Sequence, residues 1–283
     1  MDWMRMQRGA RESTLIRYRR SIADLLRDLG TDVSTFDTKG LRGFLLRHIA
    51  GASVNKILPT AMRMFLRFLI VRGLCMPGLD QAIPTIAKWR LSSLPKHIPS
   101  EDVESLINSC DLSTPLGARD RAILLLIARL GLRASDISAL MFGDIVWSQA
   151  TIIVSGKSRR STRLPLPQEV GDSILHYLAH GRPNGAGEHV FVTAIAPITA
   201  VTPSAVSGIV IRALRRTGID APIHGAHLLR HSAATTMLRD GISLPAIGAL
   251  FRHASIETTA IYAKVDIDLL KEVAMPWQGG QPC

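Results

Sequence analysis

The sequence predicts a mainly helical protein of two domains, with a small antiparallel β-sheet in the second domain. Three observations lead to this prediction. Apolar residues recur at steps of three and four along most of the chain, which is the spacing of a buried helix face. Short runs rich in β-branched residues cluster between residues 145 and 166. The length of 283 residues, 47% of them hydrophobic, suits two cores better than one.

The first part of the chain has the pattern of a small helical bundle. Apolar stripes at residues 15–29 and 41–49 predict two amphipathic helices. A third helix is predicted over residues 53–72, perturbed at Pro59 and ended by Gly73. Arginines are scattered over the other faces of these helices. This region therefore reads as a helix bundle with a basic surface.

Prolines and small polar residues then mark a linker over residues 91–97. We therefore expect one domain at residues 1–94 and a second at residues 97–283. In the second domain, helices are predicted at residues 100–109, 119–130 and 134–141, and again from residue 168 onward. The strands are predicted at residues 145–147, 151–154 and 162–166, with turn residues between them.

The positive charge of the chain is concentrated in the first domain. The net charge is +11, and residues 1–95 hold 16 Lys and Arg against 7 Asp and Glu. The remaining residues are nearly balanced. A basic module joined to a neutral one is typical of proteins that grip a polyanion, and double-stranded DNA is the expected partner. The simpler alternative is that the excess charge only aids solubility.

The composition argues against several other classes of protein. No apolar run approaches the length of a membrane-spanning helix, and no secretory signal follows Met1. The three cysteines are widely separated and form no disulfide framework. We therefore expect a cytoplasmic protein without membrane contact.

Several residues in the second domain have side chains suited to phosphate chemistry. His227 and Arg230 are spaced i, i+3, so they share one face of a helix. Arg133 follows the break at Gly131 and begins a new helix, where an anion is favoured. The spacing of His227 and His231 also allows a zinc site, but Leu228 stands where a zinc protease has glutamate, so we expect no metal.

Lys157 lies at the tip of the predicted hairpin, in the run Gly156-Lys157-Ser158. A phosphate-binding P-loop would need a glycine at position 151 and a helix after Ser158, and Thr151 and the next strand provide neither. A basic hairpin of this kind suits a DNA groove, and a solvated basic turn is the alternative.

The order of these motifs identifies a resemblance. Gly-Leu-Arg-x-Ser-Asp, a hairpin Gly-Lys, His-x-Leu-Arg-His-Ser, Arg-His-Ala-Ser and Thr-x-x-Tyr follow one another over residues 97–270. This series resembles the tyrosine recombinase, or phage integrase, family in its simple two-domain form. The helical first domain is similar to that family's core-binding domain, and the pair would form a C-shaped DNA clamp.

The resemblance implies a catalytic set without cofactor or metal. It would cut and rejoin DNA through a 3′-phosphotyrosine bond on Tyr262, whose sequence context alone would suggest an ordinary packing residue. By the same resemblance, the other members would bind the scissile phosphate or transfer protons. The set consists of Arg133, Lys157, His227, Arg230, His253 and Tyr262.

The resemblance also implies partners for the protein, and it leaves alternative functions open. Family members assemble as homo- or hetero-tetramers on two DNA sites through a C-terminal tail, and residues 267–277 have the matching apolar pattern. Self-docking of this tail in a monomer is the alternative. Arg252 stands where the family commonly has glycine. The rival functions are a type IB topoisomerase and a catalytically inactive DNA-binding protein of the same fold. Integration, excision or resolution of a mobile element or replicon is the expected role.

Overall fold

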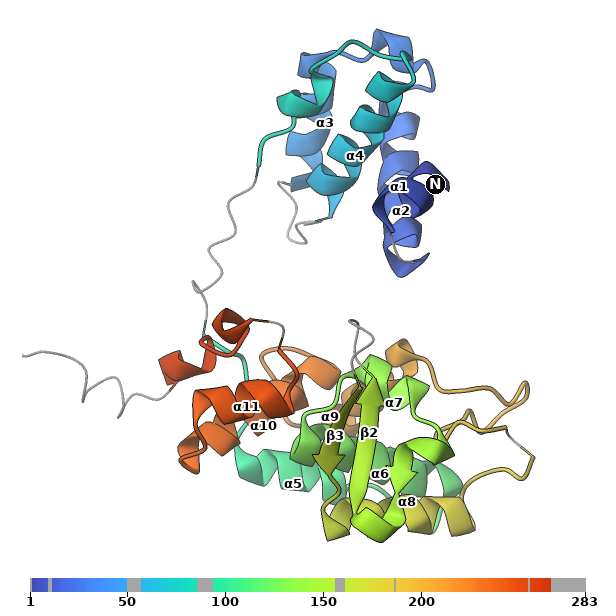
Figure 1. Cartoon of the computed structure of the whole chain (residues 1–283), viewed down its shortest axis with the longest axis vertical. Helices are drawn as coiled ribbons and strands as arrows, with labels where there is room; N and C mark the ends of the chain where they lie inside the picture. Colours follow the sequence, from blue (N-terminus) through green and yellow to red (C-terminus); the bar gives the residue numbers. More distant parts are fainter. Residues whose placement is uncertain are drawn as a thin grey trace, which may run out of the picture. The chain divides into compact units, whose positions relative to one another are not determined.

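The computed structural model describes residues 2–9, 12–49, 57–85, 94–155, 161–185, 187–253 and 255–265. The chain divides into two compact units, Met1–Arg90 and Leu91–Cys283. Each unit has its own hydrophobic core. Figure 1 shows the helices of both units and the small sheet of the second. Together they form a mainly helical protein with one small antiparallel sheet, so the predicted fold class is confirmed.

The first unit is a bundle of short helices. Its core is formed by leucine, phenylalanine and methionine side chains from both predicted stripes and from the third helix, including Leu25, Leu41, Phe44, Met62 and Leu66. The elements are α1 (Asp2–Arg8), α2 (Glu12–Leu29), η1 (Val33–Thr35), α3 (Thr38–Ile49), α4 (Leu58–Val71) and η2 (Leu79–Ala82).

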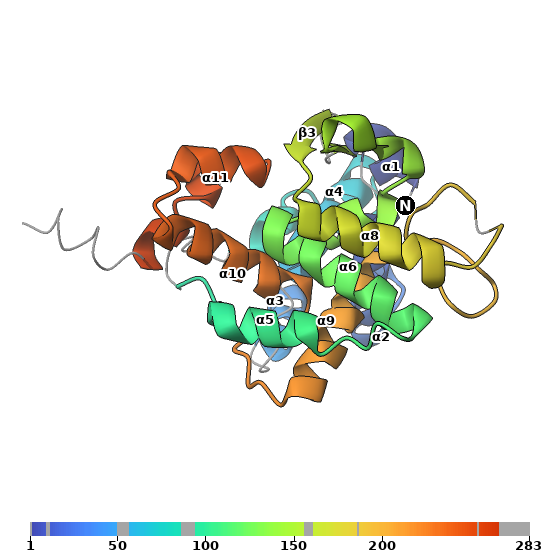
Figure 2. The ribbon, with the colours of Figure 1, turned by 90° about the horizontal axis from the view of Figure 1, so that it is seen from below.

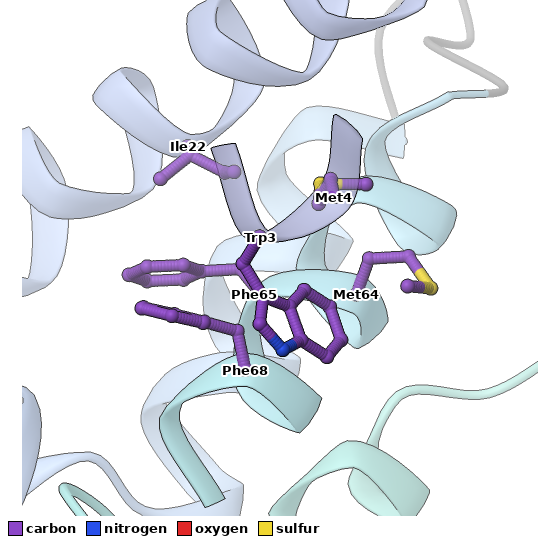
Figure 3. Close-up of a pocket in the computed structure, with 6 residues that line it drawn as sticks. All are labelled: Trp3, Met4, Ile22, Met64, Phe65 and Phe68. Carbon is purple, nitrogen blue, oxygen red and sulfur yellow. The ribbon is translucent and has the colours of Figure 1, made fainter. Parts of the chain in front are cut away.

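Two details of this unit differ from the prediction. Pro59 lies in the first turn of α4, where its fixed φ is compatible with a helix, and does not perturb a helix interior. Helix α1 was not predicted, because seven residues carry too little helix propensity to form a helix alone. Tertiary contact holds it: the Trp3 ring lies 5.7 Å from that of Phe68, in an apolar pocket shared with Ile22 and Phe65 (Figure 3).

The second unit is built around α6 (Pro115–Leu130). The run Ala122–Ile127 of this helix is almost completely buried, and α6 packs against α8 and α10 (Figure 2). It starts earlier than predicted because Thr114 caps it, with its Oγ1 accepting from the Gly117 N–H at 3.0 Å. The remaining helices are α5 (Ser100–Asn108), α7 (Ala134–Ala139), α8 (Gln168–His180), α9 (Pro203–Thr217), α10 (Ala226–Arg239) and α11 (Leu244–Leu250).

The sheet has the order β1-β2-β3, with both pairings antiparallel. Its strands are β1 (Ile145–Val146), β2 (Thr151–Ser155) and β3 (Ser161–Pro165). Ile152 pairs with Leu164, and both side chains are buried against the core. Ser155 pairs with Ser161 at the end of the hairpin. The turn at residues 156–160, which includes Lys157, lies outside the described residues, as does the predicted tail at residues 267–277.

Candidate active site

Three segments of the second unit carry the described residues of the predicted set. The first runs from the end of α6 into α7 and provides Arg133. The second is the start of α10, which provides His227 and Arg230 and begins at Gly225. The third extends from the end of α11 through the short helix η6 (Tyr262–Val265), and provides His253 and Tyr262. Figure 2 shows α10 and α11 next to each other.

Arg230 connects these three segments. Its side chain is buried, with only 5% of the residue exposed. One terminal nitrogen donates to the Gly131 carbonyl oxygen, and the other donates to the Phe251 carbonyl oxygen at 2.7 Å and to Nε2 of His253 at 3.3 Å. The guanidinium carbon also lies 4.3 Å from the centre of the Phe251 ring. These contacts fix the orientation of the guanidinium group.

Gly131 makes the close approach of α6 to this arginine possible. It ends α6 with φ of 59°, a left-handed conformation that favours glycine. A Cβ atom at this position would lie 2.4 Å from two atoms of the Phe251 ring. Glycine is therefore required here both by the backbone and by the ring that lies beneath Arg230.

We expect Gly131→Ala to lower the free energy of unfolding by about 3 kcal/mol, because it adds overpacking to left-handed strain. The matched control is Gly218→Ala. Gly218 also ends a helix with positive φ, but no atom lies within 4 Å of its hypothetical Cβ. Its loss should be about 1 kcal/mol. Urea unfolding of both variants measures the difference. Equal losses of unfolding free energy would show that the Phe251 ring moves aside without cost.

Arg133 is held at the N-terminus of α7. Its backbone N–H donates to Oδ2 of Asp136 at 3.0 Å, and its Nη2 donates to the Arg252 carbonyl oxygen at 3.1 Å. Burial lowers the pKa of Arg133, and the nearby positive charge of Arg252 lowers it further. Burial lowers the pKa of Arg230 to about 10, and the positive charge of Arg133 is the second cause. An anion between these guanidinium groups would relieve their mutual repulsion.

The protonation of His253 follows from its two partners. Arginine can only donate, so Nε2 of His253 accepts from Arg230. The proton of the neutral ring is then on Nδ1, which lies 2.7 Å from Oγ1 of Thr259. Burial and the charge of Arg230 lower the pKa of His253 to about 4, in agreement with a neutral ring.

Tyr262 is buried, with 2% of the residue exposed, and its hydroxyl lies 2.8 Å from Nδ1 of His231. Burial raises the pKa of the Tyr262 phenol to about 12. By the resemblance to the family, His227 would be the proton acceptor for this phenol, yet the structure brings His231 to it. His231 was considered only as a zinc ligand. Its position four residues after His227, on the same face of α10, is the signal that could have identified it.

The low pKa of His231 makes the free energy of unfolding depend on pH. Burial lowers its pKa from 6.5 to about 4, and His227, Arg230 and His97 add to the effect. The unfolded chain therefore takes up a proton at this residue before the folded chain does. The contribution of His231 to the free energy of unfolding is fully present above pH 6.5 and is lost as the pH decreases toward 4.

The free energy of unfolding of the wild type should fall between pH 7 and pH 5 because of His231. We expect this fall to be about 1 kcal/mol smaller in His231→Gln. The value is modest because solvent screens a partly exposed group. Urea midpoints at the two pH values provide the measurement. His176→Gln is the control, because the half-buried His176 lies on α8, away from this site. An unchanged difference in the His231 variant would refute the depressed pKa.

The zinc alternative finds no support in the geometry of the described part of the chain. Within those residues, no group of three or more histidine, cysteine, aspartate or glutamate side chains converges on a position for a metal ion. The His227 and His231 rings lie 6.3 Å apart, and His231 is bonded to Tyr262. Within the same part of the chain, no helix is both long and apolar enough to cross a bilayer.

Comparison with known proteins identifies the family. Residues 96–268 match the model of the phage integrase family. A putative integrase/recombinase, y4rA of Sinorhizobium fredii, is 41% identical over 98% of this chain and 69% of its own length. A second protein from that organism, y4rF, is 36% identical, and the match spans 52% of its length. Tyrosine recombinase XerD of Yersinia pestis is 29% identical over 96% of this chain and 93% of the relative.

Solved structures show the same fold. The XerH site-specific recombinase, in a post-cleavage complex with palindromic difH substrate, matches with a TM-score of 0.70 at 21% identity, over 87% of this chain and 73% of that one. A lambda integrase dimer bound to a COC′ core site matches with a TM-score of 0.67 at 18% identity, over 90% and 89%. The family match and the y4rA relationship confirm the resemblance found in the sequence. This chain is a member of the phage integrase family of tyrosine recombinases, enzymes that transfer DNA strands.

Proposed function

We propose that Tyr262 is the nucleophile of this recombinase and that Arg133 and Arg230 bind the scissile phosphate. The supporting observation is the convergence of Arg230, His253 and Tyr262 with no acidic side chain bonded to Arg230 among the described residues. Guanidinium groups stay charged and present paired donors, which suits the extra negative charge of a phosphoryl-transfer transition state.

The chemical step exchanges one phosphate ester for another. The Tyr262 oxygen attacks phosphorus, its phenolic proton passes to a base, and the bond to the 5′ oxygen breaks. Lys157 protonates that oxygen as general acid. The product is a 3′-phosphotyrosine, and attack by a 5′ hydroxyl reverses the step. The base is His227 by resemblance, and the 2.8 Å contact makes His231 the better-placed acceptor in this state.

His253 would donate to a phosphate oxygen after a change of tautomer. At present its Nε2 accepts from Arg230. A phosphate would replace Nε2 as the acceptor for Arg230, and the Thr259 hydroxyl can then donate to Nδ1 instead of accepting. Nε2 would carry the proton and point it at the phosphate. The Thr259 hydroxyl is therefore suited to either tautomer.

The first unit would bind the DNA backbone through its basic surface, and the second would carry the reaction. Arginines such as Arg20, Arg27 and Arg47 lie on exposed faces of α2 and α3. A tetramer on two DNA sites, and a role in integration, excision or resolution of a mobile element, complete the proposal. The names integrase and recombinase of its relatives support that role.

Sequencing the DNA trapped covalently on the wild-type protein tests this function. We expect adducts at a short repeated site, linked through a 3′ phosphate. Adducts spread over unrelated sequences, together with relaxation of supercoiled DNA, would favour a type IB topoisomerase. Absence of any adduct, with DNA binding intact, would favour the inactive DNA-binding protein.

A further inference from the structure

The turn after α11 contains an arginine at a position that favours glycine. Arg252 has φ of 52°, in the left-handed region. Its N–H donates to the Ala249 carbonyl oxygen, and the His253 N–H donates to that of Gly248, both at 3.0 Å. This pair of bonds is the Schellman arrangement that ends many helices, with Arg252 in the place usually taken by glycine. The turn thus keeps its usual geometry despite the larger residue.

The Arg252 side chain returns to the site and pairs with an acid. Its Nη2 forms an ion pair with Oδ2 of Asp136, and the two side chains are only 8% and 5% exposed. The same carboxylate oxygen accepts from the backbone N–H of Arg133. Asp136 therefore connects the start of α7 with the turn after α11.

These bonds form a closed ring with Arg133. The Arg133 side chain donates to the Arg252 carbonyl oxygen, the Arg252 side chain donates to Asp136, and Asp136 accepts from the Arg133 backbone. The backbone of Arg133 is thereby held by Asp136 and its guanidinium group by the turn, and the Arg252 side chain links the two. With glycine at position 252, the carbonyl contact would persist, but the side-chain link would not.

We propose that Arg252 is a positioning residue that holds the guanidinium group of Arg133 in place for the scissile phosphate. The proposal rests on the phosphate-binding role of Arg133 given above. It adds a residue specific to this chain, acting through Asp136 and the turn, and not by contact with DNA.

Stability alone does not account for the arginine. A left-handed residue other than glycine is strained. In addition, Nε and Nη1 of Arg252 are buried without a hydrogen-bond partner among the described residues, which is unfavourable for a charged group. The ion pair with Asp136 offsets these costs only in part. A glycine at position 252 would avoid these costs, but it would not hold Arg133 in place through Asp136.

The decisive variant is Arg252→Gly, because glycine satisfies the turn and removes only the side chain. We expect the single-turnover cleavage rate at saturating DNA to fall about 10-fold or more, since small misplacements of a catalytic group have effects of this size. DNA affinity should stay unchanged. Arg252→Lys should recover part of the rate, because the contact with Asp136 uses a single nitrogen.

A double variant separates positioning from folding. Arg252→Gly leaves the Asp136 charge buried without its partner and should lower the melting temperature. Adding Asp136→Asn removes that charge while keeping an acceptor for the Arg133 N–H. The melting temperature should recover and the cleavage rate should not. Recovery of both together would show a merely structural role and would overturn the proposal.

Failure of this proposal differs from failure of the proposed function. If the wild type forms covalent adducts and Arg252→Gly cleaves at the same rate, only the positioning role is wrong. A readout without catalysis is the side-chain Nε–H signal of Arg133 in nitrogen-15 spectra. We expect it to be sharp in the wild type and exchange-broadened in Arg252→Gly. An unchanged signal would overturn the proposal even if the protein cleaves no DNA.

Discussion

Replacing Tyr262 with phenylalanine should abolish the covalent protein–DNA adduct and leave DNA binding nearly unchanged. The variant lacks the oxygen that attacks phosphorus, and no other described tyrosine lies in the site. The loss should exceed the detection range of a gel assay with a nicked DNA substrate that prevents religation. The variant also loses the 2.8 Å contact with His231, so its free energy of unfolding should fall by about 1 kcal/mol.

The control is another buried tyrosine. Tyr177 lies in α8 with 1% of its surface exposed, and its hydroxyl accepts from the Val192 N–H at 3.5 Å. Tyr177→Phe therefore removes a buried hydroxyl of the same kind, away from the site. It should keep adduct formation with a similar small loss of stability. Adducts in the Tyr262 variant would show that the nucleophile lies elsewhere.

Arg230→Lys should reduce the cleavage rate at least about 1,000-fold, because removal of one preorganised donor already has an effect approaching this size. The two terminal nitrogens of Arg230 reach carbonyl oxygens on opposite sides, at Gly131 and Phe251. The single ammonium nitrogen of lysine cannot serve both directions and loses the flat contact with the Phe251 ring. Single-turnover cleavage at saturating DNA is the measurement.

A matched buried arginine separates catalysis from stability. Arg119 is 7% exposed, pairs with Asp120 and donates to the Val192 carbonyl oxygen. Arg119→Lys should lower the melting temperature as much as Arg230→Lys and leave the cleavage rate of the folded protein near that of the wild type. A small effect of Arg230→Lys on cleavage would contradict its role in phosphate binding.

The sequence predicts those features that depend on local pattern. The longer helices of both units follow from apolar spacing, and the sheet follows from its β-branched runs. The end of α6 at Gly131 was predicted because a left-handed helix end favours glycine whatever packs around it. The ordered motifs of the family indicated which residues to look for in the site.

Other features depend on contacts that no local pattern encodes. The spacing on α10 places His231 on the same face as His227, but it could not show that Tyr262, 31 positions further on, reaches His231. Helix α1 depends on the contact of Trp3 with Phe68. Arg252 appeared in the sequence only as a departure from glycine. Its ion pair with Asp136, 116 residues away, became visible only in the folded chain.

The long sequence separations within the site affect when the protein can act. The bonds that orient Arg230 and Arg133 span 99 and 119 residues. The last of them forms only after α10 has packed against α6 and the turn after α11 has reached the start of α7. A nascent or partly unfolded chain has the tyrosine but not the arrangement of groups around it. Under the proposed mechanism, DNA breakage therefore requires the completed fold of the second unit, and Tyr262 alone is not sufficient for it.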